Sequence, residues 1–134
     1  MIWAEITNHF QEADWRSNVE STEQLEDKDG LPLWKEKYVS GDSLILWTTT
    51  TVPNRLMTRE FIKNEKYGGH WLIQLIEVDT GTVVKMTEEK IIYSPMYRLQ
   101  YLFENPEENV DLYLKDLEKK YENQEENNSG VITF

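Results

Sequence analysis

The middle of the chain consists of strand-like segments separated by short turns, and this pattern constrains the fold more than any other. Segments rich in β-branched and aromatic residues lie at 31–39, 43–52, 55–63, 70–78 and 82–93. The connections contain Gly, Pro, Asp or Asn, which favour tight turns, and one such turn is predicted at 67–69. Strands joined by connections this short pair antiparallel. With a half-exposed strand at 19–25, the sequence predicts a meander of about six strands.

Helical periodicity flanks the meander on both sides. Two short helical pieces are predicted within 2–16 from apolar residues at helical spacing: Ile2, Trp3, Ile6 and Phe10. After the last strand, Ser94 and Pro95 are typical of a helix start, and Asn105 and Pro106 restart the helical pattern. A long amphipathic helix is predicted from an apolar stripe: Val110, Tyr113, Leu114, Leu117 and Tyr121.

These elements predict an α+β fold built on a single antiparallel sheet. The sheet must curl around the final helix to bury the apolar stripe of that helix. A curl of this kind commonly leaves a cavity, because rings of different size cannot fill the space evenly. The chain has five Trp and seven Tyr, so large side chains are available either to line such a cavity or to fill the core.

Composition excludes several classes of function. With 14 basic and 25 acidic residues in 134, the formal net charge is −11, which opposes binding to nucleic acid and to anionic membranes. The chain has no Cys, so disulfides, thiolate metal sites and cysteine nucleophiles are excluded. No apolar run is long enough to span a bilayer, and the N-terminus does not resemble a secretory signal. We expect a cytoplasmic protein without a metal or another cofactor.

Four short motifs carry a resemblance to a known superfamily. They are Trp15-Arg16-Ser17-Asn18-Val19-Glu20-Ser21, Gly68-Gly69-His70-Trp71, the segment Gly81 to Glu89 (GTVVKMTEE), and Ser94-Pro95-Met96-Tyr97-Arg98. In this order and spacing, the chain resembles the polyketide cyclase/START-like superfamily, also called SRPBCC. The resemblance implies the helix-grip fold, in which a curved meander wraps around a long C-terminal helix. It places a ligand-binding domain at 1–122, followed at 123–134 by a polar tail with an apolar end.

The resemblance also implies a function. Binding or transport of a small hydrophobic or amphipathic ligand, between the sheet and the C-terminal helix, is the leading expectation. The expected cavity residues are Trp34, Tyr38, Trp47, Trp71, Ile73, Leu75, Val84, Met86, Glu88, Tyr97, Leu102 and Tyr113. A cyclase, dehydratase or hydrolase using the same cavity is the first alternative. A protein-interaction or chaperone-regulator module, docking through the acidic final helix, is the second.

Two residues are weak catalytic candidates. Glu88 shares strand parity with Val84 and Met86, so its carboxylate is expected at the end of an inward apolar row. There it could act as an acid or base, or it could pair with Arg98 or Lys90 in a structural role. His70 is adjacent to Trp71, and if Trp71 points inward, His70 faces solvent.

The superfamily begins with a strand that has no counterpart here, because residues 1–3 already fall on the first helix. That strand would pair with the long strand at 82–93, so one edge of the sheet is expected to lack its partner. The apolar segment 131–134 could fill this edge, in the same chain or from a second copy. The alternatives are a homodimer through the exposed edge and an upstream segment not included in this sequence.

Overall fold

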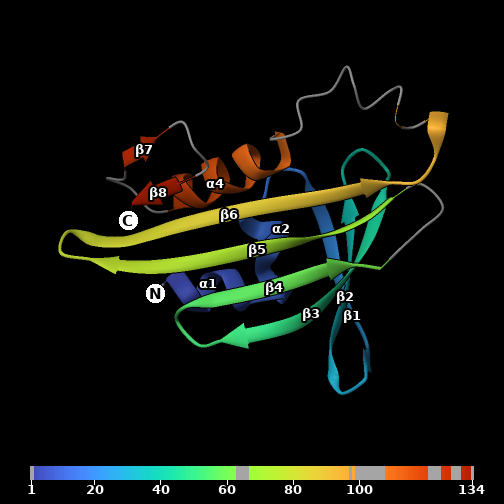
Figure 1. Ribbon diagram of the computed structural model, residues 1–134, viewed down its shortest axis with the longest axis horizontal. Helices are drawn as coiled ribbons and strands as arrows, with labels where there is room; N and C mark the ends of the chain where they lie inside the picture. Colours follow the sequence, from blue (N-terminus) through green and yellow to red (C-terminus); the bar gives the residue numbers. More distant parts are fainter. Residues whose placement is uncertain are drawn as a thin grey trace.

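The computed structural model describes residues 2–62, 67–96, 98, 108–120, 125–127 and 131–133. Short helices at the N-terminus precede a six-strand meander, and a longer helix follows it (Figure 1). The helical elements are α1 (Ile2–Thr7), the 3-10 helix η1 (His9–Gln11), α2 (Glu12–Trp15) and α4 (Glu108–Lys120). The meander strands are β1 (Val19–Lys28), β2 (Leu31–Tyr38), β3 (Ser43–Val52), β4 (Leu56–Phe61), β5 (Tyr67–Val78) and β6 (Gly81–Ile92). The α+β fold and the antiparallel meander are therefore confirmed.

Two short strands near the C-terminus extend the sheet. They are β7 (Glu125–Asn127) and β8 (Val131–Thr133), and the strand order is β1-β2-β3-β4-β5-β6-β8-β7. Val83, Val84 and Lys85 of β6 pair antiparallel with β8. Of the alternatives for the edge of the last meander strand, the structure shows the apolar end of the same chain, which covers residues 83–85 of that strand. Residues 125–127 and 131–133 of the predicted polar tail form these two strands and belong to the same sheet as the meander.

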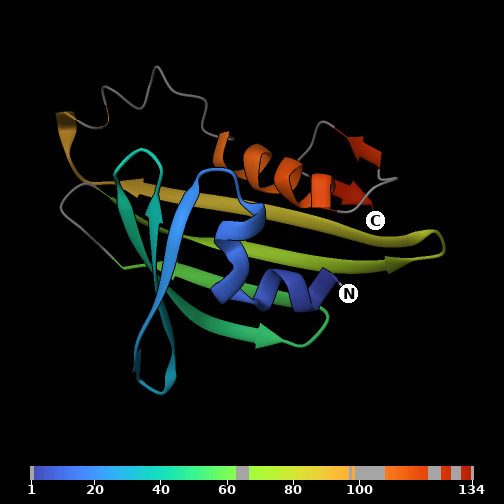
Figure 2. The ribbon, with the colours of Figure 1, turned by 180° about the vertical axis from the view of Figure 1, so that it is seen from behind.

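The helices cover one face of the curved sheet. Seen from behind, α1 and α2 lie in front of β4 and β5, and α4 runs beside β6. The strands β1 and β2 run steeply across the direction of β5 (Figure 2). Buried apolar side chains of the described residues form a core between the helices and this inner face. Its members are Ile6, Leu44, Leu46, Met57, Phe61, Trp71, Ile73, Val84, Met86, Val110, Tyr113, Leu114 and Leu117. Strand alternation explains the strand members of this set, since every second side chain of a strand points to the same face.

A polar contact ties α4 to the connection between α2 and β1. The buried carboxylate of Asp116 on α4 accepts hydrogen bonds from the backbone N–H and the hydroxyl of Ser17, both at 2.8 Å to Oδ2. These two groups follow directly after α2, so the contact fixes the end of that helix against α4.

The turn predicted at 67–69 is wrong. Gly68 and Gly69 lie within β5 and pair with Ile91 and Lys90 of β6. Gly69 has φ of +137°, and a Cβ at this position would collide with the backbone carbonyl of Glu89. The glycines therefore serve close approach of two strands, a requirement that composition alone does not distinguish from that of a turn.

Candidate functional site

Charged side chains occupy the inner face where alternation reserves places for apolar ones. On β2, Glu36 lies between the inward positions of Trp34 and Tyr38, and its exposed fraction is 0%. On β4, Arg59 lies between Met57 and Phe61, and its exposed fraction is 1%. Charged groups are almost never buried to this extent unless they are paired.

The N-terminal helices bring three more polar residues to the same place. His9, Glu12 and Arg16 are all buried, and Glu12 and Arg16 are four residues apart, which puts them on one side of a helical turn. We call these five residues the charged cluster: His9, Glu12, Arg16, Glu36 and Arg59. Helix α2 with the residue that follows it supplies one carboxylate and one guanidinium to the cluster, and the sheet supplies the other two.

The two guanidinium groups meet on the two carboxylates. Nη1 of Arg16 lies 3.0 Å and 2.9 Å from Oε1 and Oε2 of Glu36, and 3.0 Å from Oε2 of Glu12. Nη1 of Arg59 lies 3.2 Å from Oε1 of Glu12 and 3.2 Å from Oε2 of Glu36. The hydroxyl of Tyr38 donates to Oε1 of Glu36 at 2.8 Å. The cluster therefore joins α2 to β2 and β4 through charge-assisted hydrogen bonds.

His9 enters this cluster as a neutral ring. Burial, assisted by the positive charge of Arg59, lowers the pKa of His9 to about 2. The neutral imidazole donates its Nδ1–H to Oε1 of Glu12, at 2.6 Å. The imidazole edge also packs against the ring of Trp34, with 5.5 Å between centroids.

The two carboxyl groups have opposite pKa shifts. Burial raises the pKa of Glu36 and the neighbouring Glu12 raises it further, against the opposing effect of Arg16 and Arg59. For Glu12, burial also acts upward, but Arg59, the hydrogen bond with Glu36 and Arg16 outweigh it, so the pKa is lowered. Glu12 therefore holds the negative charge more firmly, and Glu36 is the first of the pair to take up a proton.

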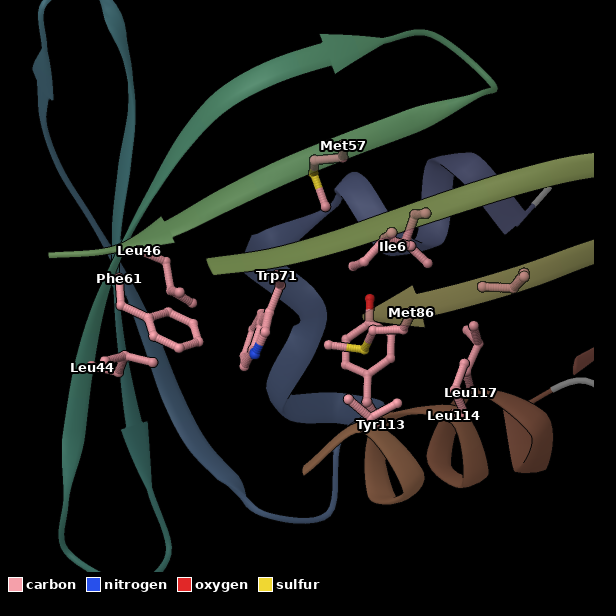
Figure 3. Close-up of a cluster of buried hydrophobic side chains, with 13 residues drawn as sticks. Ile6, Leu44, Leu46, Met57, Phe61, Trp71, Met86, Tyr113, Leu114 and Leu117 are labelled. Carbon is pink, nitrogen blue, oxygen red and sulfur yellow. The ribbon is translucent and has the colours of Figure 1, made fainter. Parts of the chain in front are cut away.

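Aromatic rings enclose the guanidinium groups. The Arg16 guanidinium lies 5.3 Å from the ring centroid of Trp71 and 5.1 Å from that of Tyr113. Figure 3 shows Tyr113 rising from α4 toward the sheet, in the region of Trp71 and Met86. Nε1 of Trp71 donates to Oε2 of Glu88 at 2.6 Å. Burial raises the pKa of the Tyr113 phenol, so it stays protonated beside the cluster.

Several buried polar atoms around the cluster have no hydrogen-bond partner among the residues that the structure describes. They are Nε1 of Trp15, Nε of Arg16, Oγ1 of Thr48, Nε and Nη2 of Arg59, and the hydroxyl oxygen of Tyr113. Thr48 belongs to this site because it is the direct register partner of Arg59 across β3 and β4. Buried polar groups are nearly always hydrogen-bonded, so a group of unpartnered ones in one place calls for an explanation.

Most of the expected cavity residues lie on this inner face. Trp34, Trp71, Ile73, Val84, Met86 and Tyr113 are buried, and Tyr38, Leu75 and Glu88 are partly buried. The expectation that Trp47 lies on the inner face is wrong. Trp47 points to the opposite face from Leu46 and Thr48, and its Nε1 donates to the backbone carbonyl of Lys28 at 3.1 Å. Tyr97 and Leu102 lie outside the described residues.

The weak catalytic candidates are separated by the sheet. Glu88 is on the inner face, where it accepts the bond from Trp71 and lies 3.8 Å from Nζ of Lys90. His70 is on the outer face, 3.9 Å from the carboxylate of Glu89. His70 therefore cannot act together with the charged cluster.

The sequence reasoning missed Glu12, Glu36 and Arg59, and it used Arg16 only as part of a motif. A signal was present in the strand alternation, because Trp34-x-Glu36-x-Tyr38 and Met57-x-Arg59-x-Phe61 each put a charge at an inward position. An inward carboxylate on one strand and an inward guanidinium on another together predict a buried ion pair.

Within the described parts of the chain, no group of three or more His, Cys, Asp or Glu side chains is arranged to hold a metal ion. No described helix is long and apolar enough to cross a membrane. Comparisons with protein-family models, with curated proteins and with solved structures find no match for this chain. The resemblance to the START-like superfamily therefore remains a prediction from the motifs.

Proposed function

We propose that this chain has the helix-grip fold and binds a small amphipathic molecule between the inner face of its sheet and α4. The observation that carries the proposal is the group of unpartnered polar atoms around the charged cluster, six in all. Apolar side chains such as Ile73, Met86 and Leu114 surround the same region and suit the apolar body of a ligand.

A purely structural role explains this arrangement poorly. An unpartnered buried polar group costs about 1–3 kcal/mol, and a whole domain is stable by only about 5–15 kcal/mol. Buried ion pairs are also seldom more stabilising than well-packed apolar residues of the same size. A bound molecule that supplies partners for these atoms removes the cost, which supports a binding function over simple core filling.

An acid–base enzyme acting in the same site is the second candidate. The opposite pKa shifts of Glu12 and Glu36 favour it, because two carboxyl groups with separated proton affinities are the usual basis of acid–base pairs. If a molecule that co-purifies with the protein is converted on incubation at neutral pH, and Glu12→Gln abolishes the conversion, this candidate holds. An unchanged mass after incubation counts against it.

Native mass spectrometry of the purified protein tests the binding function, together with thermal melts in the presence of decanoate and of 1-decanol. We expect a retained small molecule in the native spectrum, and a higher melting temperature with at least one of the two probes. Protein stripped of ligand by unfolding and refolding is the control for the native spectrum. If no mass is retained and neither probe raises the melting temperature, the proposed function is wrong.

A further inference from the structure

Arg59 uses only one of its two hydrogen-bonding edges. Its Nη1 contacts Glu12 and Glu36, whereas Nε and Nη2 have no partner in the described part of the chain. Nε–H and one Nη2–H of a guanidinium point the same way and form a fork that matches the two oxygens of a carboxylate. The unpartnered side of Arg59 is therefore a complete two-donor edge, held in place by the ion pairs on the other side.

The chemistry of the other unpartnered atoms indicates what is missing. Trp15, Arg16 and Arg59 contribute nitrogen atoms that can only donate, and Thr48 and Tyr113 contribute hydroxyls that are able to donate. Among the described residues, no carboxylate oxygen belongs to this unpartnered set. The partner that satisfies these atoms must be rich in acceptors.

Thr48 lies where it can assist the Arg59 edge. The two residues are direct register partners on the inner face, so their Cβ atoms are about 4.5–5.5 Å apart. The next register partner of Arg59 is Trp71, whose ring centroid is 6.0 Å from the Arg59 guanidinium carbon. A flat acceptor group bound on the edge would thus have a hydroxyl donor on one side and an aromatic wall on the other.

We propose that the bound molecule carries a carboxylate, and that this carboxylate docks on the Nε–Nη2 edge of Arg59 beside the hydroxyl of Thr48. The inference rests on the proposed function and names the ligand's chemical class. The apolar body of the ligand extends along the inner face toward α4.

The charge of a ligand carboxylate also affects the ionisable groups of the charged cluster. Arg16 and Arg59 already face Glu12 and Glu36, while Tyr38, Tyr113 and the neutral His9 complete the surroundings. A ligand carboxylate brings a further negative charge, which raises the pKa of Glu36 beyond the effect of burial and of Glu12. Any proton that is taken up on binding is therefore expected on Glu36.

The test compares decanoate with 1-decanol, which share an apolar tail, by tryptophan fluorescence titration. We expect decanoate to bind at least tenfold more tightly than 1-decanol. Arg59→Lys keeps the positive charge but removes the two-donor edge, so decanoate affinity should fall at least tenfold while 1-decanol affinity stays within about twofold. Calorimetry of decanoate in two buffers of different ionisation enthalpy measures any proton uptake.

Thr48→Val keeps the test decisive even if Arg59→Lys does not fold, because it removes only a hydroxyl without a protein partner. It should weaken decanoate binding several-fold and leave 1-decanol unaffected, whereas the exposed Thr50→Val on the same strand should change neither. If the two probes bind equally well and these variants change neither affinity, the proposed binding function stands but the carboxylate inference is wrong. Water is then the partner of the Arg59 edge. If neither probe binds, the carboxylate inference is wrong, and the proposed function is wrong as well when the native spectrum also shows no retained molecule.

Discussion

Arg16 and Glu36 are 20 positions apart in the sequence, and Nη1 of Arg16 bridges both carboxylate oxygens of Glu36 at 2.9 Å and 3.0 Å. Both side chains are buried, so the contact connects the end of α2 to the centre of the inner face of β2. The position of the N-terminal helices on the sheet therefore depends on a charged contact rather than on apolar packing alone.

The first prediction concerns the loss of one partner from this pair. Glu36→Gln leaves Arg16 and Arg59 with a single buried carboxylate, and removing one partner of a buried ion pair typically costs about 3–5 kcal/mol. We expect the free energy of unfolding, measured by urea denaturation, to fall by that amount. The control is Glu20→Gln, because Glu20 and Lys37 form an exposed pair at 3.6 Å that should contribute less than about 1 kcal/mol. Equal losses in the two variants would show that the cluster does not stabilise the fold.

The second prediction is a pH dependence that comes from His9. The unfolded chain binds a proton on this ring below its usual pKa of 6.5, but the folded chain does not, because the pKa is lowered to about 2. His9 therefore does not change the free energy of unfolding above pH 6.5. Below that pH it lowers the free energy of unfolding, with a slope that approaches about 1.4 kcal/mol per pH unit.

Urea titrations between pH 7.5 and pH 5 measure this slope. His9→Gln should remove the part of the slope that develops below pH 6.5. His70→Gln is the matched control, since the His70 side chain is 38% exposed on the outer face, and it should leave that part in place. A wild-type slope that persists in His9→Gln would show that His9 takes up a proton in the folded state.

The third prediction separates the two faces of the sheet with one substitution. Trp71 is 3% exposed and packs against Phe61 and Tyr113, so Trp71→Ala should cost about 3–5 kcal/mol of unfolding free energy. Trp47 lies on the outer face, where Nζ of Lys28 is 4.4 Å from its ring centroid, and Trp47→Ala should cost less than half as much. Similar losses for the two variants would contradict the assignment of Trp71 to the core.

The sequence predicts the meander because strand alternation and turn residues are local signals. Alternation also places Trp71, Ile73 and Met86 correctly on the inner face, since parity within a strand follows from the sequence once one residue is assigned. Trp47 was misplaced because a ring of this size suits either a core or a half-exposed outer face. The side chains of its neighbours Leu46 and Thr48 are buried on the inner face, so Trp47 points outward.

The charged cluster could be predicted only in part. The bonds of Arg59 to Glu12 and Glu36 span 47 and 23 residues, so no local spacing brings these groups together. An inward charge on a strand can be recognised from parity, but its partner depends on how the sheet curls and where α2 rests. Gly69 is a similar case, because its role comes from the approach of Glu89 on the next strand.

The last prediction concerns the strand that the C-terminus adds to the sheet. Val83, Val84 and Lys85 of β6 pair with β8, which occupies the edge where the superfamily resemblance places a first strand. Deleting residues 129–134 removes β8 and leaves the donors and acceptors of this stretch without their partners. Amides of 83–85 that point toward β8 should then exchange faster with solvent, whereas amides of β4 (Leu56–Phe61), between β3 and β5, should not change.

An exposed edge also favours pairing with a second copy, so the shortened chain should dimerise more readily in sedimentation than the intact chain. If exchange at 83–85 and mass in solution are the same for both chains, β8 does not protect this edge.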